Sequence, residues 1–114
     1  MRDCELPERP TPLDGVRVVE MADGAGEVCG RILADLGADV IRVEPPGGAP
    51  SRRSEPLHEG VSLRHAVQNA GKRSVVVDPS GEDGRERLLG LLDGADVWIE
   101  SARPGSLAAL GLGA

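Results

Sequence analysis

VRVVEMADGAGEVCGRILADLGADVIRVE, residues 16–44, is the stretch that decides the fold. Its two ends are rich in β-branched side chains, which predicts one strand over residues 16–20 and another over residues 38–44. Between them, the apolar residues of segment 24–36 repeat with helical spacing, and Gly37 follows where a helix C-cap is expected. A strand, a helix and a second strand in this order predict a βαβ unit with parallel strands and a right-handed crossover.

The next part of the chain continues the same alternation. Residues 74–78 predict a third strand, which Pro79 ends. A leucine-rich helix follows and finishes at Gly94, and Ser80 with Asp83 resembles a capping box at its start. This half of the sequence therefore predicts a second strand and helix of the same layered type.

A fourth strand over residues 95–100 and a short helix over residues 106–110 complete the predicted elements. The polar segment 45–72 shows only a short helix around residues 61–68. A segment of this length with so little regular structure is usually functional or docked on another part of the protein.

Together these elements predict the α/β class: a Rossmann-like parallel sheet of about four strands with flanking helices. A parallel sheet needs helices on both faces, and two full helices with a short third do not cover both. We therefore expect an incomplete doubly wound unit over residues 13–114, preceded by a flexible leader over residues 1–12, which is rich in proline and charge.

Composition excludes several functions. The net charge of -6 argues against nucleic acid and membrane surfaces as partners, and Trp98 is the only aromatic residue. His58 and His65 lack a metal-ligand spacing with any cysteine, so no metal site is expected. We expect Cys4 and Cys29 to be free thiols, with Cys29 buried, and the protein to be cytoplasmic, because no apolar run is long enough to cross a membrane.

Ligands of open parallel sheets bind outside the carboxyl ends of the strands, and helix starts attract anions. In this sequence those ends are the loops 20–26, 44–48, 77–80 and 100–105. Four loops on one edge can line a single crevice, so the sequence predicts a ligand site there.

The glycines at positions 24, 26 and 30 are spaced much like a dinucleotide-binding fingerprint, and Glu44 lies near the distance expected for a ribose partner. Three residues separate Gly24 from the strand, however, and Asp23 would place a negative charge beside the phosphates. The alternative, which we favour, is that these glycines permit a loose turn and close helix packing.

Four segments carry a resemblance to a known family. PLDGVRVVE (12–20), LGADVIRVEPPGG (36–48), NAGKRSVVVD (69–78) and ADVWIESARPG (95–105) resemble strands and turns at the amino-terminal end of family III (CaiB/BaiF-type) coenzyme A transferases. The resemblance implies that residues 13–114 are the amino-terminal Rossmann-like part of that family's large domain.

The resemblance also implies a chemistry. The family transfers coenzyme A between carboxylic acids through an anhydride and a thioester on an aspartate, which lies downstream of the segments matched here. Its subunits interlock in pairs, and relatives with the same fold racemise acyl-CoA. Coenzyme A or acyl-CoA would be a substrate, with no permanently bound cofactor, and carboxylic acids would be the other small-molecule partners.

By position, the resemblance carries over a set of coenzyme A contacts at or near the strand-end loops. They are Gly24, Ala25, Pro45, Val77, Asp78, Pro79, Ser80, Ser101, Ala102, Arg103 and Ala109. In the family, the positions matching Pro45 and Ala109 often carry a basic residue, which this chain lacks at both. Arg42, Arg53, Lys72 and Arg103 are the candidates to compensate.

The resulting hypothesis is an amino-terminal segment of an acyl-CoA:carboxylate coenzyme A transferase that contributes part of the coenzyme A crevice. It lacks the catalytic aspartate and is inactive alone, because covalent catalysis needs a positioned nucleophile. The alternatives are an acyl-CoA racemase relative and a stand-alone module that binds coenzyme A or a nucleotide without catalysis. We also expect self-association through apolar surface on an uncovered sheet face, or a family-type dimer.

Overall fold

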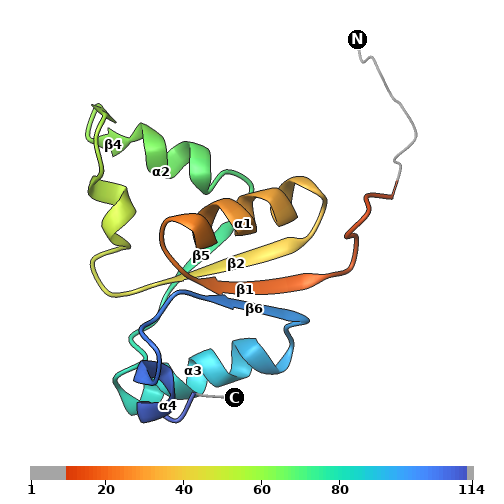
Figure 1. Ribbon diagram of the computed structural model, residues 1–114, viewed down its shortest axis with the longest axis vertical. Helices are drawn as coiled ribbons and strands as arrows, with labels where there is room; N and C mark the ends of the chain where they lie inside the picture. Colours follow the sequence, from red (N-terminus) through yellow and green to blue (C-terminus); the bar gives the residue numbers. More distant parts are fainter. Residues whose placement is uncertain (1–9, 113–114) are drawn as a thin grey trace.

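The computed structural model describes residues 10–112 (Figure 1). Its main sheet contains β1 (Arg17–Met21), β2 (Asp39–Glu44), β5 (Arg73–Val76) and β6 (Val97–Glu100). The strands lie in the order β5-β2-β1-β6 and every neighbouring pair is parallel. The predicted α/β fold with a four-stranded parallel sheet is therefore confirmed. Most of the predicted leader lies outside the described residues.

Helices cover both faces of this sheet. Helix α1 (Ala25–Asp35) crosses one face, whereas α3 (Glu82–Asp93) and the short α4 (Ser106–Ala109) lie on the other, as Figure 1 shows. The chain runs outward through β1, β2 and β5 and then returns to place β6 on the other side of β1. This reversal between β1 and β6 is the topological switch point at which open α/β sheets bind ligands.

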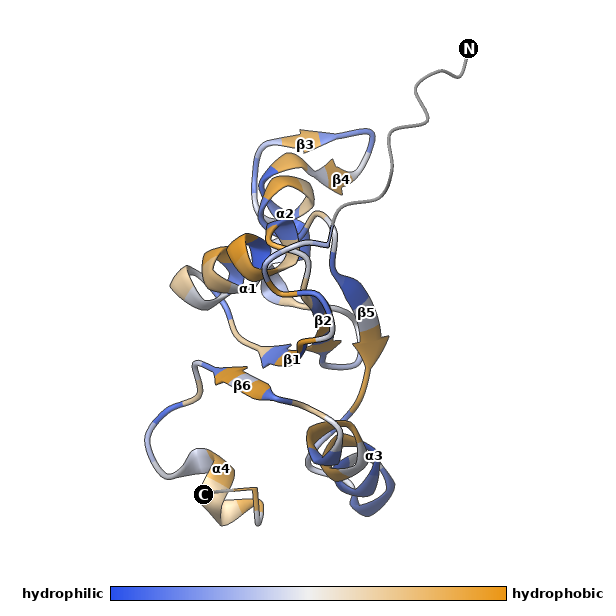
Figure 2. Cartoon of the chain, turned by 90° about the vertical axis from the view of Figure 1, so that its right-hand side faces the viewer, coloured by the Kyte–Doolittle hydropathy of each residue, from blue (hydrophilic) through white to orange (hydrophobic). Residues whose placement is uncertain are grey.

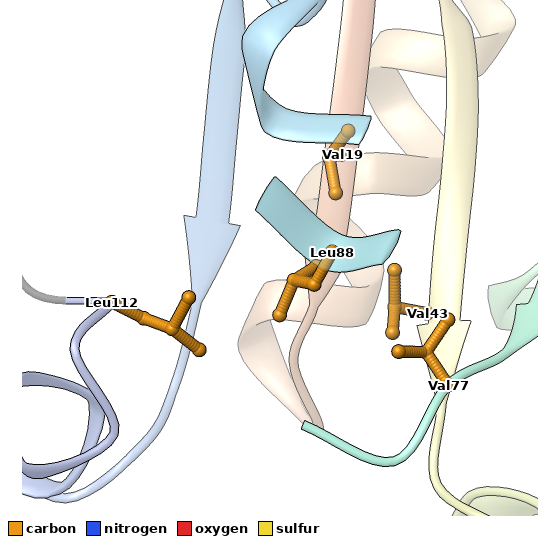
Figure 3. Close-up of a cluster of buried hydrophobic side chains, with 5 residues drawn as sticks. All are labelled: Val19, Val43, Val77, Leu88 and Leu112. Carbon is orange, nitrogen blue, oxygen red and sulfur yellow. The ribbon is translucent and has the colours of Figure 1, made fainter. Parts of the chain in front are cut away.

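The period of two along the strands separates two different interiors. On the α3 face, Val19 and Val43 pack with Val77, Leu88 and Leu112 in an apolar cluster (Figure 3). On the α1 face, a smaller apolar cluster contains Val18, Ala38 and Val40. The next residues of the same parity on β1 and β2 are charged, namely Glu20, Arg42 and Glu44, and all three are buried.

The polar segment between β2 and β5 is more structured than its sequence predicted. It contains a 3-10 turn (η1, Pro50–Arg53), a two-stranded antiparallel hairpin of β3 (Leu57–His58) and β4 (Val61–Ser62), and helix α2 (Leu63–Gln68). The predicted short helix is confirmed, and the hairpin was missed because each strand has only two residues. We call residues 49–70 the strap.

Two local predictions are wrong. Ser80 does not cap α3, whose N-cap is Gly81, because the Ser80 backbone N–H and hydroxyl both donate to the carboxylate of Asp78, at 3.0 and 2.6 Å. Cys29 is exposed rather than buried. Cys4 lies outside the described residues.

Cys29 is exposed because α1 faces the sheet with Glu27 and Gly30 in its first half and with Leu33 and Ala34 in its second. The buried residues of α1 are Glu27 and Gly30, while Val28, Ile32 and Leu36 keep 40–53% of their surface exposed. Apolar residues are visible on α1 and on the hairpin of the strap in Figure 2. The exposed apolar surface thus lies largely on a helix and on the strap instead of on an uncovered sheet face. Among residues 10–112, no helix has the length and apolar character needed to cross a membrane.

Substitution of two adjacent leucines should separate the core from the surface. Leu88 is fully buried in the α3 cluster, whereas Leu89 is 44% exposed. We expect Leu88→Ala to lower the free energy of unfolding by about 2–4 kcal/mol, since it leaves a cavity, and Leu89→Ala to lower it by less than about 1 kcal/mol. Urea denaturation of both variants measures the difference, and equal losses would contradict this assignment of the core.

Candidate functional site

All four parallel strands end at the same edge of the sheet, and the turns that follow them carry the predicted site residues. The turns after β1 and β6 are joined directly, because the backbone N–H of Asp23 donates to the hydroxyl of Ser101 at 3.0 Å. After β6, the backbone N–H of Ala102 donates to Glu100 at 2.8 Å, and Arg103 lies exposed in the same turn. Ser101, Ala102 and Arg103 thus stand beside the start of the β1–α1 connection.

The largest cavity described along this edge lies between the start of α3 and the end of α4 and has a volume of about 540 Å³. It brings the predicted residues Pro79 and Ser80 together with Ala109, which is distant from them in sequence. Its lining comprises Pro79, Ser80, Gly81, Glu82, Arg85, Ala108, Ala109, Leu110 and Gly111. Because α4 lies on the same face of the sheet as α3, the turn after β5 faces residues 108–111.

Arg85 is the residue of this cavity that sequence reasoning missed. It lies in the second turn of α3, and a Cβ added to Gly111 would come within 3.0 Å of its guanidinium. Its proximity to Ala109 depends on the return of the chain through β6 and α4. The available signal was its position one turn after a helix start, where anions are attracted.

The turn between β5 and α3 is held by local hydrogen bonds. The bonds from the Ser80 hydroxyl and backbone N–H stabilise the carboxylate of Asp78 and lower its pKa below the ordinary value. A Cβ added to Gly84 would overlap the backbone carbonyl of Asp78, so α3 packs directly on this turn. Val77 is buried in the core, so any contact that it makes with a ligand must come from its backbone.

Two other predicted residues, Gly24 and Pro45, line smaller cavities along the same edge. Gly24 lies at a cavity of about 380 Å³ between the start of α1 and the strap. Pro45 lies at another, of about 250 Å³, above the ends of β1 and β2. Ala25 is exposed at the first position of α1. The predicted contacts therefore share one edge but are distributed over separate hollows.

Beneath this edge lies a cluster of buried charges that the sequence did not reveal. The guanidinium of Arg42 pairs with Glu20, lies 3.4 Å from Glu27, and donates to the carbonyl of Ala22 at 2.7 Å. The ammonium of Lys72 lies 2.6 Å from the other oxygen of Glu20 and donates to the carbonyl of Glu27 at 2.8 Å. Two cations and two carboxylates thus balance within the interior.

Polar groups of the strap complete this cluster. The carboxylate of Glu27 accepts hydrogen bonds from the Asn69 amide at 2.6 Å, from the Ser51 hydroxyl at 3.0 Å and from the backbone of Gly24 at 3.2 Å. Burial opposes its charged form, but these bonds and the charge of Arg42 outweigh burial, and the pKa of Glu27 lies below its ordinary value. Glu27 therefore ties the β1–α1 turn, the sheet and the strap together.

At two basic groups nearby, burial prevails over the charges of their partners and disfavours the charged form. It lowers the pKa of Lys72 in spite of the contact with Glu20. It also lowers the pKa of His65, an effect that the charge of Arg52 strengthens. His65 accordingly lies in the strap as a neutral imidazole at pH 7, with Nδ1 2.8 Å from the Ser51 hydroxyl.

A second ion pair fixes the strap at the end of β2. The Arg52 guanidinium binds both oxygens of Glu44, at 2.5 and 2.7 Å, and the backbone N–H of Ala49 donates to the same carboxylate at 2.8 Å. The hydrogen bonds from Arg52 are the largest influence on the pKa of Glu44. Together with the other contacts they outweigh burial and lower this pKa to about 2. The same contact raises the pKa of Arg52.

Parallel α/β domains with cavities at the carboxyl ends of their strands form a class that typically binds ligands there. Comparison with known proteins identifies the family within this class. The sequence model of CoA-transferase family III matches residues 13–114. The chain belongs to CoA-transferase family III.

Relatives support this assignment over nearly the whole chain. The chain is 42% identical over 106 residues to the "Probable fatty acyl-CoA transferase Rv3272" of Mycobacterium tuberculosis, covering 90% of this chain and 27% of that protein. It is 46% identical over 101 residues to the "Succinyl-CoA:(R)-benzylsuccinate CoA-transferase subunit BbsE" of Thauera aromatica, covering 84% of this chain and 25% of the relative. The chain therefore spans only about a quarter of these relatives.

Solved structures agree. A CAIB/BAIF family protein from Brucella suis superimposes with a TM-score of 0.87 at 43% identity, over 93% of this chain and 30% of that one. The orthorhombic crystal form of Rv3272 from M. tuberculosis gives a TM-score of 0.85 at 41% identity, over 93% of this chain and 31% of that one.

Two glycine substitutions should show that the buried charges govern how α1 packs. A Cβ at Gly30 would overlap Glu20 and approach Lys72, whereas a Cβ at Gly90 of α3 meets nothing within 4 Å. We expect Gly30→Ala to lower the free energy of unfolding by about 2–4 kcal/mol, because it displaces a buried ion pair. Gly90→Ala should raise it by about 0.5–1 kcal/mol through helix propensity. Similar urea midpoints for the two variants would contradict this packing.

The Glu44–Arg52 pair should make stability depend on pH. The pKa of Glu44 falls from an ordinary 4.5 to about 2 on folding, so its contribution is present at neutral pH and is lost as the pH falls from about 5 towards 2. We expect about 1–3 kcal/mol, reduced by solvent around the half-exposed Arg52. Urea midpoints of Glu44→Gln and of the original chain should therefore converge as the pH falls.

Glu86→Gln, at an exposed position of α3, is the matched control and should change stability by less than about 0.5 kcal/mol throughout. A gap between Glu44→Gln and the original chain that stays constant from pH 7 to pH 3 would exclude the proposed role of the pair.

Proposed function

We propose that this chain is the amino-terminal segment of an acyl-CoA:carboxylate coenzyme A transferase and supplies part of its coenzyme A crevice. The observation that carries the proposal is the family match over residues 13–114. Its support is that the relatives are named as CoA-transferases, including one that uses succinyl-CoA. These names favour transfer over racemisation and over binding without catalysis.

The cavity between α3 and α4 is the best candidate for an anionic part of coenzyme A. It offers the polar start of α3, the hydroxyl of Ser80 and the guanidinium of Arg85. Arg85 places a cation in the same hollow as Ala109, where the family often has a basic residue. We therefore propose that Arg85 takes over part of the phosphate recognition.

Two of the basic residues first considered for this role have other partners. Arg42 and Lys72 are buried against Glu20, so neither is available to a ligand at the edge. Arg53 donates weakly to the carbonyl of Gly47, at 3.4 Å, and Arg103 is exposed beside Ser101. Arg85 and Arg103 are accordingly the cations that this proposal assigns to the nucleotide end of the ligand.

The proposal assigns no catalytic residue to the chain and no metal. Asp78 is held by Ser80, and Asp23 lies 3.7 Å from the guanidinium of Arg42, so each of these edge carboxylates has a structural partner. The nucleophile belongs, on this proposal, to the part of the relatives' length that the chain does not span. We further propose a cytoplasmic location, and a subunit or dimer contact that covers the exposed stripe of Val28, Ile32 and Leu36.

Binding of coenzyme A to the chain tests the crevice. We expect titration calorimetry to detect coenzyme A, and Arg85→Gln to weaken the affinity about tenfold through the loss of a charge-assisted hydrogen bond. Arg87→Gln, on the same helix, is the matched control and should leave the affinity unchanged. Absence of heat at millimolar coenzyme A would overturn the crevice, and heat with NADH alone would favour the dinucleotide interpretation of the glycines.

A separate assay addresses catalysis. The chain mixed with succinyl-CoA and an acceptor carboxylate should exchange coenzyme A at the uncatalysed rate, measured by chromatography of the thioesters. Transfer above that rate would show that a nucleophile is present within these 114 residues.

A further inference from the structure

The strap, residues 49–70, contributes little to the apolar core of the domain beyond the buried Ala49 at its start. Within residues 10–112, neither of the two apolar clusters contains a strap residue. Its larger apolar side chains remain 45–65% exposed: Leu57, Val61, Leu63 and Val67. Hydrophobic burial, the main force that holds α1 and α3 in α/β domains, therefore contributes little here.

Polar contacts with two buried carboxylates hold the strap instead. Ser51 and Asn69 donate to Glu27 of α1, while Arg52 and the backbone of Ala49 donate to Glu44 of β2. Lys72 and Arg31 add one bond each from the domain side, to the Asn69 side chain and to the carbonyl of Val67. The attachment thus depends on a few hydrogen bonds and ion pairs. We call this set of contacts the latch.

The strap is also bonded within itself. The hydroxyl of Ser54 donates to the carbonyl of Ser51 at 2.7 Å and lies 3.1 Å from the hydroxyl of Ser62. Ser62 in turn accepts from the backbone of His65 at 3.2 Å, and Leu63 donates to the carbonyl of Pro56 at 3.0 Å. These bonds connect the 3-10 turn, the hairpin and α2, so the strap is one cooperative unit whose bonds form and break together.

Glycines flank the strap at both ends. Gly47 and Gly48 both have a φ of +89° before it, and Gly71 has a φ of +83° after it. Residues of this type absorb backbone rotations that side chains would hinder. The chain therefore has a flexible joint on each side of the strap.

We propose that the strap is a lid over the cavity beside the start of α1. The domain contributes Asp23, Gly24 and Glu27 to this cavity of about 380 Å³, and the strap contributes the rest, including Ser51, Arg64 and Gln68. When the contacts to Glu27 and Glu44 are released, the strap opens as this unit between its flanking glycines and its internal hydrogen bonds break. The cavity, which is already partly open to solvent, then loses one wall. Because Glu27 also accepts from the backbone of Gly24, opening reaches the turn between β1 and α1. The lid does not depend on coenzyme A being the ligand.

Native-state hydrogen exchange on the 114-residue chain tests this inference. The amides of Leu63, His65 and Asn69, which are bonded within the strap, should exchange as one group and faster than those of β1 and β2. Low concentrations of urea should change the strap group less than the sheet group, since opening the lid exposes less surface than unfolding.

Asn69→Ala tests the latch itself. It removes the bond to Glu27, and we expect exchange of the strap amides to accelerate about tenfold while the amides of β1 and β2 keep their rates. Ser106→Ala removes a hydroxyl bond on the opposite side of the sheet and should leave the strap unchanged. If Asn69→Ala does not fold, the urea dependence of the original chain decides. The lid is excluded if strap and sheet amides share one exchange free energy in the original chain, or accelerate equally in Asn69→Ala.

Discussion

The rest of the structure depends on keeping Arg42 charged and buried between two carboxylates. Removing a charge from water costs several kcal/mol, which only close partners and hydrogen bonds offset. Glu20 on β1 and Glu27 on α1 supply those partners, so both elements must hold one position relative to β2. The first half of helix α1 therefore faces the sheet with Glu27 and Gly30, whereas Leu33 packs on the sheet further along and Val28, Ile32 and Leu36 remain exposed.

The two faces of the sheet consequently follow different rules. The α3 face is an aliphatic core in which Val19, Val43 and Leu88 tolerate changes according to volume. The α1 face combines a small apolar cluster with a polar network, in which the loss of one member leaves the others buried without partners. The strap belongs to this second face, since it is attached through Glu27 and Glu44.

The sequence predicted the strands, the main helices and the parallel direction of the strands, because hydrophobic periodicity and the glycine and proline positions report local structure directly. It did not predict the charged face. Glu20 and Arg42 share the parity of Val18 and Val40, so opposite charges on neighbouring strands were the available signal, but pairing in space depends on register. Arg85 was missed for a similar reason, since its neighbours in the cavity come from the far end of the chain. The Ser80 cap failed because Asp78, two residues away, competes for the same hydroxyl.

Two separate sets of contacts position the turns at the carboxyl edge of the sheet. The turn after β1 is fixed from below, by Arg42 on the carbonyl of Ala22 and by Glu27 on the backbone of Gly24. The turn after β5 is fixed locally, by Asp78 and Ser80, with α3 packed against it. The Asp23–Ser101 bond connects the first turn with the chain that leads to α4. A ligand that spans this edge therefore contacts the turn after β1, which the buried charges position, and the turn after β5, which its own hydrogen bonds position. Movement of the strap can alter the turn after β1 without disturbing the turn after β5.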